Sequence, residues 1–168
     1  MIRFPAEWEP QSAVIIAWPH ASGDFTNLSA VEDSYHFIAS TITRFQPLII
    51  LCKDAAHEAH IRTQLPNNDN LYYINTEYND IWVRDTVFLS MEWQHPKASV
   101  QLVNFRFNGW GNKYPHSADD HINLTLFAHP IFKGLPTATL DLVFEGGSIE
   151  SDGQGTLMTT RNCLLNPN

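Results

Sequence analysis

Basic residues are scarce in this sequence of 168 residues. It contains ten Lys and Arg against eighteen Asp and Glu, and no two of the basic residues are adjacent. Proteins that bind nucleic acid use clustered Lys and Arg to neutralise phosphates. The scattered pattern therefore predicts no nucleic-acid partner. The net charge of −8 is compatible with attraction of a small cation, although acidity by itself more commonly serves solubility.

Long apolar runs and a cysteine framework are also missing. No run approaches the roughly 18 apolar residues that a membrane-spanning helix needs, and the N-terminal ten residues lack the apolar core of a secretory signal. The two cysteines, Cys52 and Cys163, do not make a disulfide framework, and both are predicted to be inert thiols of the core. We therefore expect a cytoplasmic protein with no membrane partner.

Metal-ligand spacing is absent among the eight histidines. His57 and His60 lie three positions apart with Glu58 between them, on a predicted surface helix. This falls short of the H-E-x-x-H pattern, and no third ligand is evident. We predict no metal and no cofactor.

The composition is that of one folded domain with a core, because 43% of the residues are hydrophobic and 12% are aromatic. Apolar runs predict buried strands at Ser12–Trp18, Leu48–Cys52 and Leu71–Asn75. Helical patterns separate these three runs. Alternation of buried strands with helices predicts an α/β fold with a mixed sheet.

Both helices of this first part carry end signals. Ser29 and Glu32 form a capping box, Pro47 ends the first helix, and Asp54 caps a second helix that runs to Leu65. The first helix has an apolar face at helical spacing, made of Val31, Tyr35, Ile38, Ile42 and Phe45.

The second part of the chain reads mainly as strands joined by polar or Gly-rich turns. We expect one helix there, over Ser117–His129. The expected strands are Trp82–Met91, Val100–Phe107, Leu140–Phe144 and Thr156–Thr159.

Three segments of this second part combine carboxylates or amides with Trp and Gly. They are N-D-I-W-V-R-D-T at 79–86, F-N-G-W-G-N-K-Y at 107–114 and F-E-G-G-S-I-E at 144–150. A carboxylate accepts two parallel N–H bonds from a guanidinium, and an indole face attracts the same cation. Glycines let the backbone approach a ligand closely. The combination favours a guanidinium-binding pocket.

Together with P-A-E-W-E-P at 5–10, A-W-P at 17–19 and L-L-N-P-N at 164–168, these segments resemble the agmatine deiminase family. That family belongs to the guanidine-modifying superfamily, which includes bacterial peptidylarginine deiminases. The resemblance implies roughly half of a pseudo-fivefold α/β propeller of the pentein type, built of ββαβ-like units. Half of a propeller leaves strand edges open, and the C-terminal strand at 156–159 is expected to lack a partner.

The resemblance also assigns residues. Asp85 and Glu145 match the two carboxylates that hold the guanidinium, and Trp82, Asn108 and Trp110 match the neighbourhood of the substrate. Without the resemblance, Asp85 is interpreted as a residue that caps a turn or pairs with Arg84. On the expected strand, the side chain of Asp85 faces the side opposite to that of Trp82. Glu145 reads equally as a turn cap or a ligand-facing carboxylate. Asn108–Gly111 reads as a turn. The 86–88 segment, T-V-F, departs from the T-G-P usual in the family.

The implied reaction converts agmatine to N-carbamoylputrescine and ammonia in putrescine biosynthesis, through a Cys-thiouronium intermediate. Family members carry the nucleophilic Cys and a His-x-Asp pair in a later half, and no H-x-D occurs in these residues. We therefore expect residues 1–168 to be the N-terminal part of a single deiminase catalytic domain, inactive alone. We also expect a homo-oligomer or association with the missing C-terminal half. The alternatives are a peptidylarginine or arginine deiminase, and a non-catalytic binding or assembly module.

Overall fold

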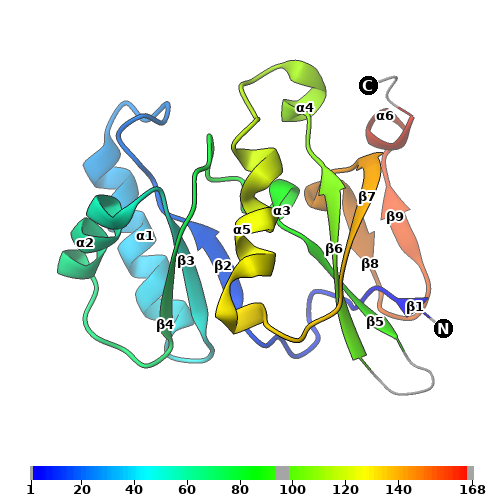
Figure 1. Cartoon of the computed structure of the whole chain (residues 1–168), viewed down its shortest axis with the longest axis horizontal. Helices are drawn as coiled ribbons and strands as arrows, with labels where there is room; N and C mark the ends of the chain where they lie inside the picture. Colours follow the sequence, from blue (N-terminus) through cyan, green and yellow to red (C-terminus); the bar gives the residue numbers. More distant parts are fainter. Residues whose placement is uncertain (1, 94–98, 166–168) are drawn as a thin grey trace. The chain divides into compact units, whose positions relative to one another are not determined.

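The computed structural model describes residues 2–93 and 99–165 (Figure 1). The end of the L-L-N-P-N segment, residues 166–168, lies outside the described residues. The chain forms two compact units, each described by itself below: Pro10–Val83, called the 10–83 unit, and Met1–Glu9 with Arg84–Asn168, called the 84–168 unit. In the described ranges, no helix has both the length and the apolar character needed to cross a membrane.

The 10–83 unit is a parallel sheet in the order β2-β3-β4, with both of its long helices on one side of the sheet (Figure 1). The strands confirm the three predicted runs, and they alternate with the helices because parallel neighbours need crossover connections. The elements are β2 (Val14–Ala17), α1 (Leu28–Ile42), β3 (Leu48–Cys52), α2 (Ala55–Gln64) and β4 (Leu71–Asn75).

The core of this unit lies between the sheet and its helices. All five residues of β3 are buried, including Cys52, as predicted for that thiol. Burial raises the pKa of Cys52 to about 12, so the thiolate form is suppressed. The buried cluster comprises Trp18, Ala39, Leu48, Ile50, Cys52, Ile61 and Leu65.

The start of α1 differs from the prediction. Asn27 is the N-cap, and its side-chain oxygen accepts from the backbone N–H of Ala30 at 3.2 Å, so the capping box at Ser29 is wrong. Glu32 instead accepts from the indole N–H of Trp18 at 3.1 Å, and this tertiary bond takes the carboxylate away from the helix end. Of the predicted apolar face, Tyr35 and Ile42 pack against the core. Ile38 is 41% exposed, and Phe45 lies beyond the end of α1 and is 76% exposed, so the prediction is wrong for these two residues. The cap at Asp54 is confirmed, because its carboxylate accepts from the N–H of His57 at 2.8 Å.

The 84–168 unit is built on a four-stranded sheet in the order β1-β5-β6-β7. β6 and β7 are parallel, and the other pairs are antiparallel. The strands are β1 (Ile2–Arg3), β5 (Leu89–Trp93), β6 (Ser99–Arg106) and β7 (Thr137–Val143), followed by the hairpin of β8 (Ile149–Ser151) and β9 (Leu157–Thr159). The short helical elements are α3 (Val83–Thr86), which begins on the last residue of the other unit, α4 (Gly109–Asn112), η1 (Asp119–His121), α5 (Ile122–Ala128), η2 (Pro130–Phe132), η3 (Gly146–Ser148) and α6 (Arg161–Leu164).

Two strand predictions for this unit need correction. The expected strand Trp82–Met91 is a helical turn in its first half, α3, and β5 starts only at Leu89. The C-terminal strand does have a partner, because β9 pairs antiparallel with β8. The strands at 100–107 and 156–159 and the helix at 117–129 are otherwise found within a few residues of their expected positions.

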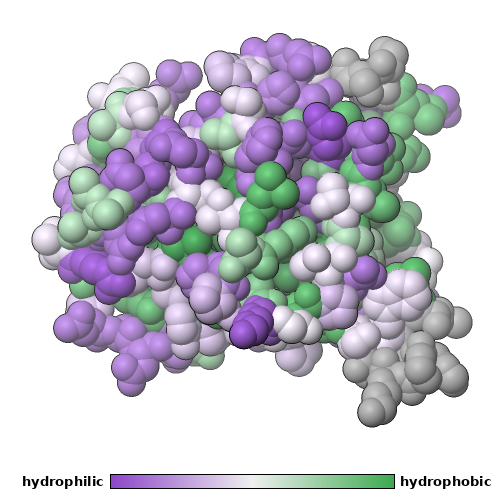
Figure 2. Space-filling view, in the orientation of Figure 1, coloured by the Kyte–Doolittle hydropathy of each residue, from purple (hydrophilic) through white to green (hydrophobic). Residues whose placement is uncertain are grey.

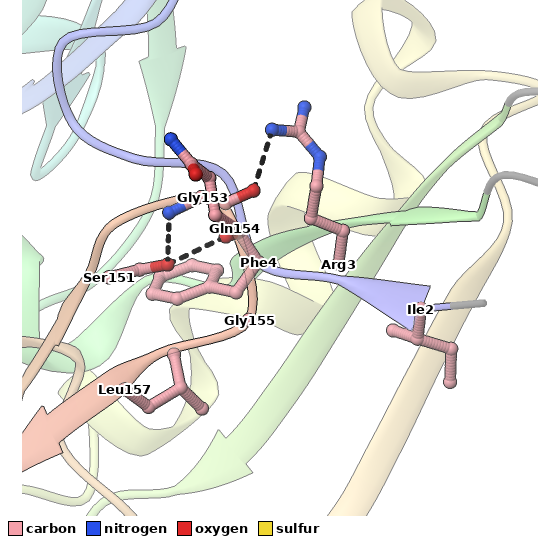
Figure 3. Close-up of a pocket in the computed structure, with 8 residues that line it drawn as sticks. All are labelled: Ile2, Arg3, Phe4, Ser151, Gly153, Gln154, Gly155 and Leu157. Atoms are coloured by element: carbon pink, nitrogen blue, oxygen red, sulfur yellow. Dashed lines mark hydrogen bonds between the residues drawn. The ribbon is translucent and has the colours of Figure 1, made fainter.

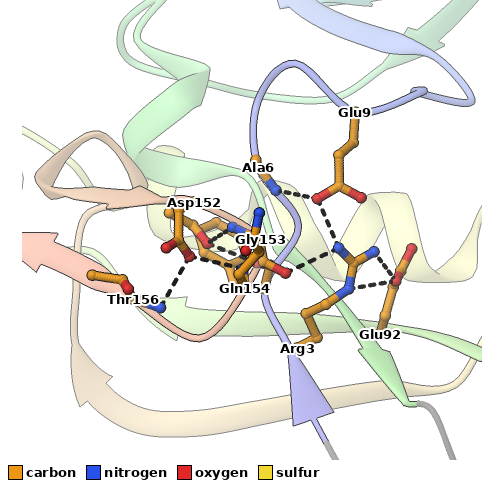
Figure 4. A network of polar contacts seen from close by, with 10 residues as sticks. Arg3, Ala6, Glu9, Glu92, Asp152, Gly153, Gln154 and Thr156 are labelled. Atoms are coloured by element: carbon orange, nitrogen blue, oxygen red, sulfur yellow. Dashed lines mark hydrogen bonds and ion pairs between the residues drawn. The ribbon is translucent and has the colours of Figure 1, made fainter.

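A polar network ties the first strand to the loop between β8 and β9 (Figure 4). The Arg3 guanidinium donates to the carboxylates of Glu9 and Glu92 and to the carbonyl of Gly153. In the loop, the Asp152 carboxylate accepts from the N–H groups of Gln154 and Thr156 at 2.8 and 3.0 Å. The network joins residues about 150 positions apart and holds β1 in the sheet.

The N-cap of α1 provides a test of the fold. We expect Asn27→Ala to lower the free energy of unfolding by about 1 kcal/mol, because the N–H of Ala30 loses its acceptor. Ser29→Ala is the matched control, and it should change stability by less than about 0.5 kcal/mol. Urea denaturation of both variants decides between the two caps, and a larger loss at Ser29 would restore the capping box.

Candidate functional site

Asp85 occupies the helical turn α3, not a strand. Its carboxylate accepts two hydrogen bonds from elsewhere in the 84–168 unit. Oδ2 accepts from the indole Nε1 of Trp110 at 3.1 Å, and Oδ1 accepts from the backbone N–H of Gly147 at 2.8 Å. Each oxygen has a further lone pair, so the carboxylate is held in place and can still accept a pair of parallel N–H bonds.

Trp110 reaches Asp85 from a single turn of left-handed helix. Residues 109–112 all have positive φ, including the non-glycine residues Trp110 (56°) and Asn112 (59°). Left-handed backbone at a Trp is strained and persists only where the surroundings enforce it. Here the N–H of Asn112 donates to the carbonyl of Asn108 at 2.7 Å, and the Asn108 side chain accepts from the N–H of Gly111 at 2.9 Å.

Neighbouring rings fix the orientation of the Trp110 indole. Phe107 meets it edge-on with ring centroids 5.1 Å apart, and Tyr114 does so at 5.8 Å. Such edge-to-face contacts are favourable for aromatic pairs. The strained turn and the two rings together leave the indole N–H directed at Asp85.

The Glu145–Gly146–Gly147 turn needs both of its glycines. A Cβ at Gly146 would lie 2.3 Å from the backbone oxygen of Arg84, and a Cβ at Gly147 would lie 2.2 Å from Oδ1 of Asp85. The turn therefore packs directly against α3, and its Gly147 N–H reaches the carboxylate because no side chain intervenes. The E-G-G pattern at 145–147 indicates close approach of the backbone, but the sequence does not predict that Gly147 donates to Asp85.

Glu145 stands at the start of the same turn. Burial raises the pKa of its carboxyl, and the negative charge of Asp85 raises that pKa further. Two carboxylates in one partly buried place repel each other when both are ionised. A bound cation would relieve both the burial penalty and the repulsion, so the arrangement suits a planar cation with several N–H donors.

The structure brings together three of the five residues singled out in the sequence: Asp85, Trp110 and Glu145. Asn108 shapes the left-handed turn through its side chain. Trp82 is 58% exposed at the end of the 10–83 unit. Cys163 is exposed on α6, so the prediction that it lies in the core is wrong.

A pocket of about 260 Å³ lies elsewhere in the 84–168 unit (Figure 3). Its lining contains none of the five predicted site residues, and the guanidinium of its one charged residue, Arg3, is already engaged by Glu9, Glu92 and the Gly153 carbonyl. Within residues 2–93 and 99–165, no group of three or more His, Cys, Asp or Glu side chains could hold a metal ion.

Comparison with protein families finds a match to the Porphyromonas-type peptidyl-arginine deiminase family over residues 3–168. Among curated proteins, the agmatine deiminase of Pseudomonas aeruginosa is 33% identical over 99% of this chain and 45% of its own length. The agmatine deiminase of Medicago truncatula is 32% identical over 99% of this chain and 46% of its own length. The chain thus spans about half the length of the curated relatives it matches.

Solved structures give the same result. The C. jejuni agmatine deiminase with substrate bound aligns with a TM-score of 0.85 at 26% identity, over 99% of this chain and 48% of that one. The Enterococcus faecalis agmatine deiminase aligns with a TM-score of 0.85 at 28% identity, over 99% and 45%. The mixed α/β fold therefore matches about half of these agmatine deiminases.

The raised pKa of Glu145 predicts a pH-dependent stability. A carboxyl whose pKa is higher in the folded than in the unfolded chain stabilises the fold below its unfolded value, 4.5, and loses that contribution as the pH rises through its folded value. We expect Glu145→Gln to stabilise the chain at about pH 7.5 but not at about pH 4, because the glutamine side chain carries no charge at either pH. The gain should stay below about 1 kcal/mol because the side chain is only partly buried.

The measurement is urea unfolding at the two pH values, with Glu150→Gln on the exposed side of β8 as the control. A Glu145→Gln variant that is less stable at neutral pH would show that Glu145 makes a favourable ionic contact instead.

Proposed function

This chain belongs to the Porphyromonas-type peptidyl-arginine deiminase family, and on that premise we propose that it supplies the guanidinium-holding part of an agmatine deiminase. The observation that carries the proposal is the carboxylate of Asp85, fixed by Trp110 and Gly147, with Glu145 on the same turn. The similarity to agmatine deiminases over nearly the whole chain supports the choice of substrate.

In the proposed reaction, Asp85 and Glu145 grip the guanidinium of agmatine and keep it charged. The charged form is the better electrophile at its central carbon. A cysteine thiolate attacks that carbon, ammonia leaves, and water then attacks the resulting thiouronium to release N-carbamoylputrescine. Trp82, three residues before Asp85 in the sequence and 58% exposed, stays a predicted substrate-binding residue.

The nucleophile is proposed to lie outside residues 1–168. Cys52 is unsuited to the role because it is fully buried in β3 and its pKa is raised to about 12. Since relatives are about twice as long, we infer that the thiolate and its acid–base partner come from polypeptide that corresponds to their remaining part. Both units described above would then belong to one catalytic domain, about half of a pentein propeller, in the cytoplasm.

An exposed apolar surface of the 84–168 unit supports this proposal. In Figure 2, hydrophobic side chains gather at the right-hand edge, over β7, β9 and α6. The residues, each at least 37% exposed, are Leu140, Leu142, Val143, Leu157, Met158, Leu164 and Leu165. A contiguous apolar surface on an edge strand tends to recruit other polypeptide.

The substrate is the point on which family members could differ. The family's description names peptidyl-arginine, whereas the curated relatives above are agmatine deiminases. Agmatine ends in an amine and arginine in an amino acid, so the contacts at the far end of the substrate discriminate between them. We favour agmatine because the curated relatives named agmatine deiminase match 99% of this chain.

We expect the 168-residue chain to bind agmatine without converting it. Asp85→Asn should weaken the binding of agmatine by at least about tenfold, because a charged partner of the guanidinium is lost. In a complete enzyme, the same substitution should cost more than about 3 kcal/mol of transition-state stabilisation. Isothermal titration with agmatine, arginine and an N-acyl-arginine amide, paired with an ammonia-release assay, measures both.

Asp141→Asn, on the exposed strand β7, is the control for charge alone. Ammonia release by the 168-residue chain would contradict the proposed location of the nucleophile. Agmatine affinity that is unchanged in Asp85→Asn would contradict the role of the carboxylate and favour a non-catalytic module.

We also expect the purified 168-residue chain to self-associate through its apolar surface. Light scattering coupled to size exclusion should show dimers or larger species at micromolar concentration. Leu142→Lys, near the C-terminal end of β7, should shift the species toward monomer. Phe37→Lys on the exposed side of α1 serves as the control. A compact monomer in the unmodified chain would argue against an uncovered surface.

A further inference from the structure

The segment that follows Asp85 has backbone groups that its own secondary structure does not use. Thr86 ends the helical turn α3, and β5 begins only at Leu89. Between them the chain must change from helical to extended backbone within three residues. Thr86 is buried, and a buried backbone carbonyl or N–H needs a partner.

Asn123 of α5 supplies those partners. Its side-chain Nδ2 donates to the carbonyl of Thr86 at 2.9 Å, and its Oδ1 accepts from the N–H of Phe88 at 2.9 Å. One amide side chain thus pairs with two backbone groups of alternate residues, much as a neighbouring strand would. The bonds bracket Val87 and hold the whole connection against α5.

The amide of Asn123 is itself held firmly. The second Nδ2 hydrogen donates to the side-chain oxygen of Asn104 on β6 at 2.6 Å. Asn123 is 1% exposed and Asn104 is 4% exposed, so water does not compete for these bonds. Both donors of Asn123 and one lone pair of its oxygen are in use, which defines a single orientation of the amide.

Aromatic packing of the Phe88 side chain also holds the 86–88 segment in place. The ring of Phe88 lies 5.8 Å from that of Phe127 in α5 and 5.5 Å from that of Phe132 in η2. Phe88 therefore contributes its N–H to Asn123 and its ring to the helix that bears Asn123. A proline at this position could make neither the N–H bond nor this aromatic contact.

We propose that Asn123 is a positioning residue for Asp85: by clamping Thr86 and Phe88 it fixes the end of α3, so that the Asp85 carboxylate meets Trp110 and Gly147. Asn123 does not touch the ligand, because its side chain is buried and its amide donors are fully used. This inference deepens the proposed guanidinium site and rests on it only for the binding readout described below.

The test compares Asn123→Ala with Leu126→Ala in the 168-residue chain. Both remove a buried side chain from α5, so both should lower the thermal midpoint, but Leu126 is not bonded to the 86–88 segment. The specific readout is the ¹H–¹⁵N resonance of the Trp110 indole, assigned with Trp110→Phe. This resonance reports the bond between the indole N–H and Asp85.

In Asn123→Ala we expect the indole resonance to move toward that of a solvent-bonded tryptophan. The agmatine affinity of Asn123→Ala should fall by at least about tenfold. In Leu126→Ala the indole resonance should keep its position, and the agmatine affinity should stay within about twofold of that of the unmodified chain. An indole resonance that is unchanged in Asn123→Ala would overturn the inference, whatever happens to stability.

The inference and the proposed function fail separately. If the unmodified chain does not bind agmatine, the proposed function fails, but the indole resonance still decides the role of Asn123. If Asn123→Ala does not fold, amide exchange in the unmodified chain decides instead. Protection of the Phe88 N–H like that of the β5 amides supports the clamp, and exchange as fast as in an exposed loop overturns it.

Discussion

The hydrogen bonds to the Asp85 carboxylate are the interaction on which the candidate site depends. They join three segments far apart in the sequence: the helical turn α3, the left-handed turn at 109–112 and the Glu-Gly-Gly turn at 145–147. Each segment is shaped to reach this one group. Two glycines permit the close approach of the third segment, and two neighbouring rings orient the indole of the second. The bonds to this carboxylate account for both the strained backbone of Trp110 and the absence of a side chain at Gly147.

The site is not arranged for stability. Trp110 and Asn112 adopt left-handed backbone, and Glu145 is partly buried beside another carboxylate. Each feature costs free energy in the absence of a ligand. A cation that bridges the two carboxylates would offset the electrostatic part of this cost. The buried amides of Asn123 and Asn104 are bonded to each other, and Asn123 also bonds the backbone of Thr86, next to Asp85. These bonds are shielded from water. Strained or electrostatically unfavourable residues that face a ligand, supported by a fully hydrogen-bonded buried layer, are typical of sites that are preorganised for a ligand.

Much of the 10–83 unit could be predicted from its sequence, because buried parallel strands read as short apolar runs and Asp54 signals its helix locally. The errors lie where tertiary contacts override local signals. Glu32 looks like half of a capping box, but it bonds to the Trp18 indole, and Asn27 caps α1 instead. The 82–91 segment looks like a continuous strand because most of its residues are apolar or β-branched. Its first half is helical, and the side chain of Asn123, 35 residues further on, bonds the backbone that leads into β5.

The sequence by itself determined which residue types could hold a guanidinium: two carboxylates, glycines beside one of them, and tryptophans nearby. These are local properties, which the amino-acid sequence displays directly. Only the tertiary structure decided what each residue does. Trp110 donates its indole N–H to Asp85, Asn108 shapes the turn beneath it, and Gly147 brings a backbone N–H to the same carboxylate. These roles depend on hydrogen-bond directions between segments that are distant in the chain, and no local sequence pattern specifies such directions.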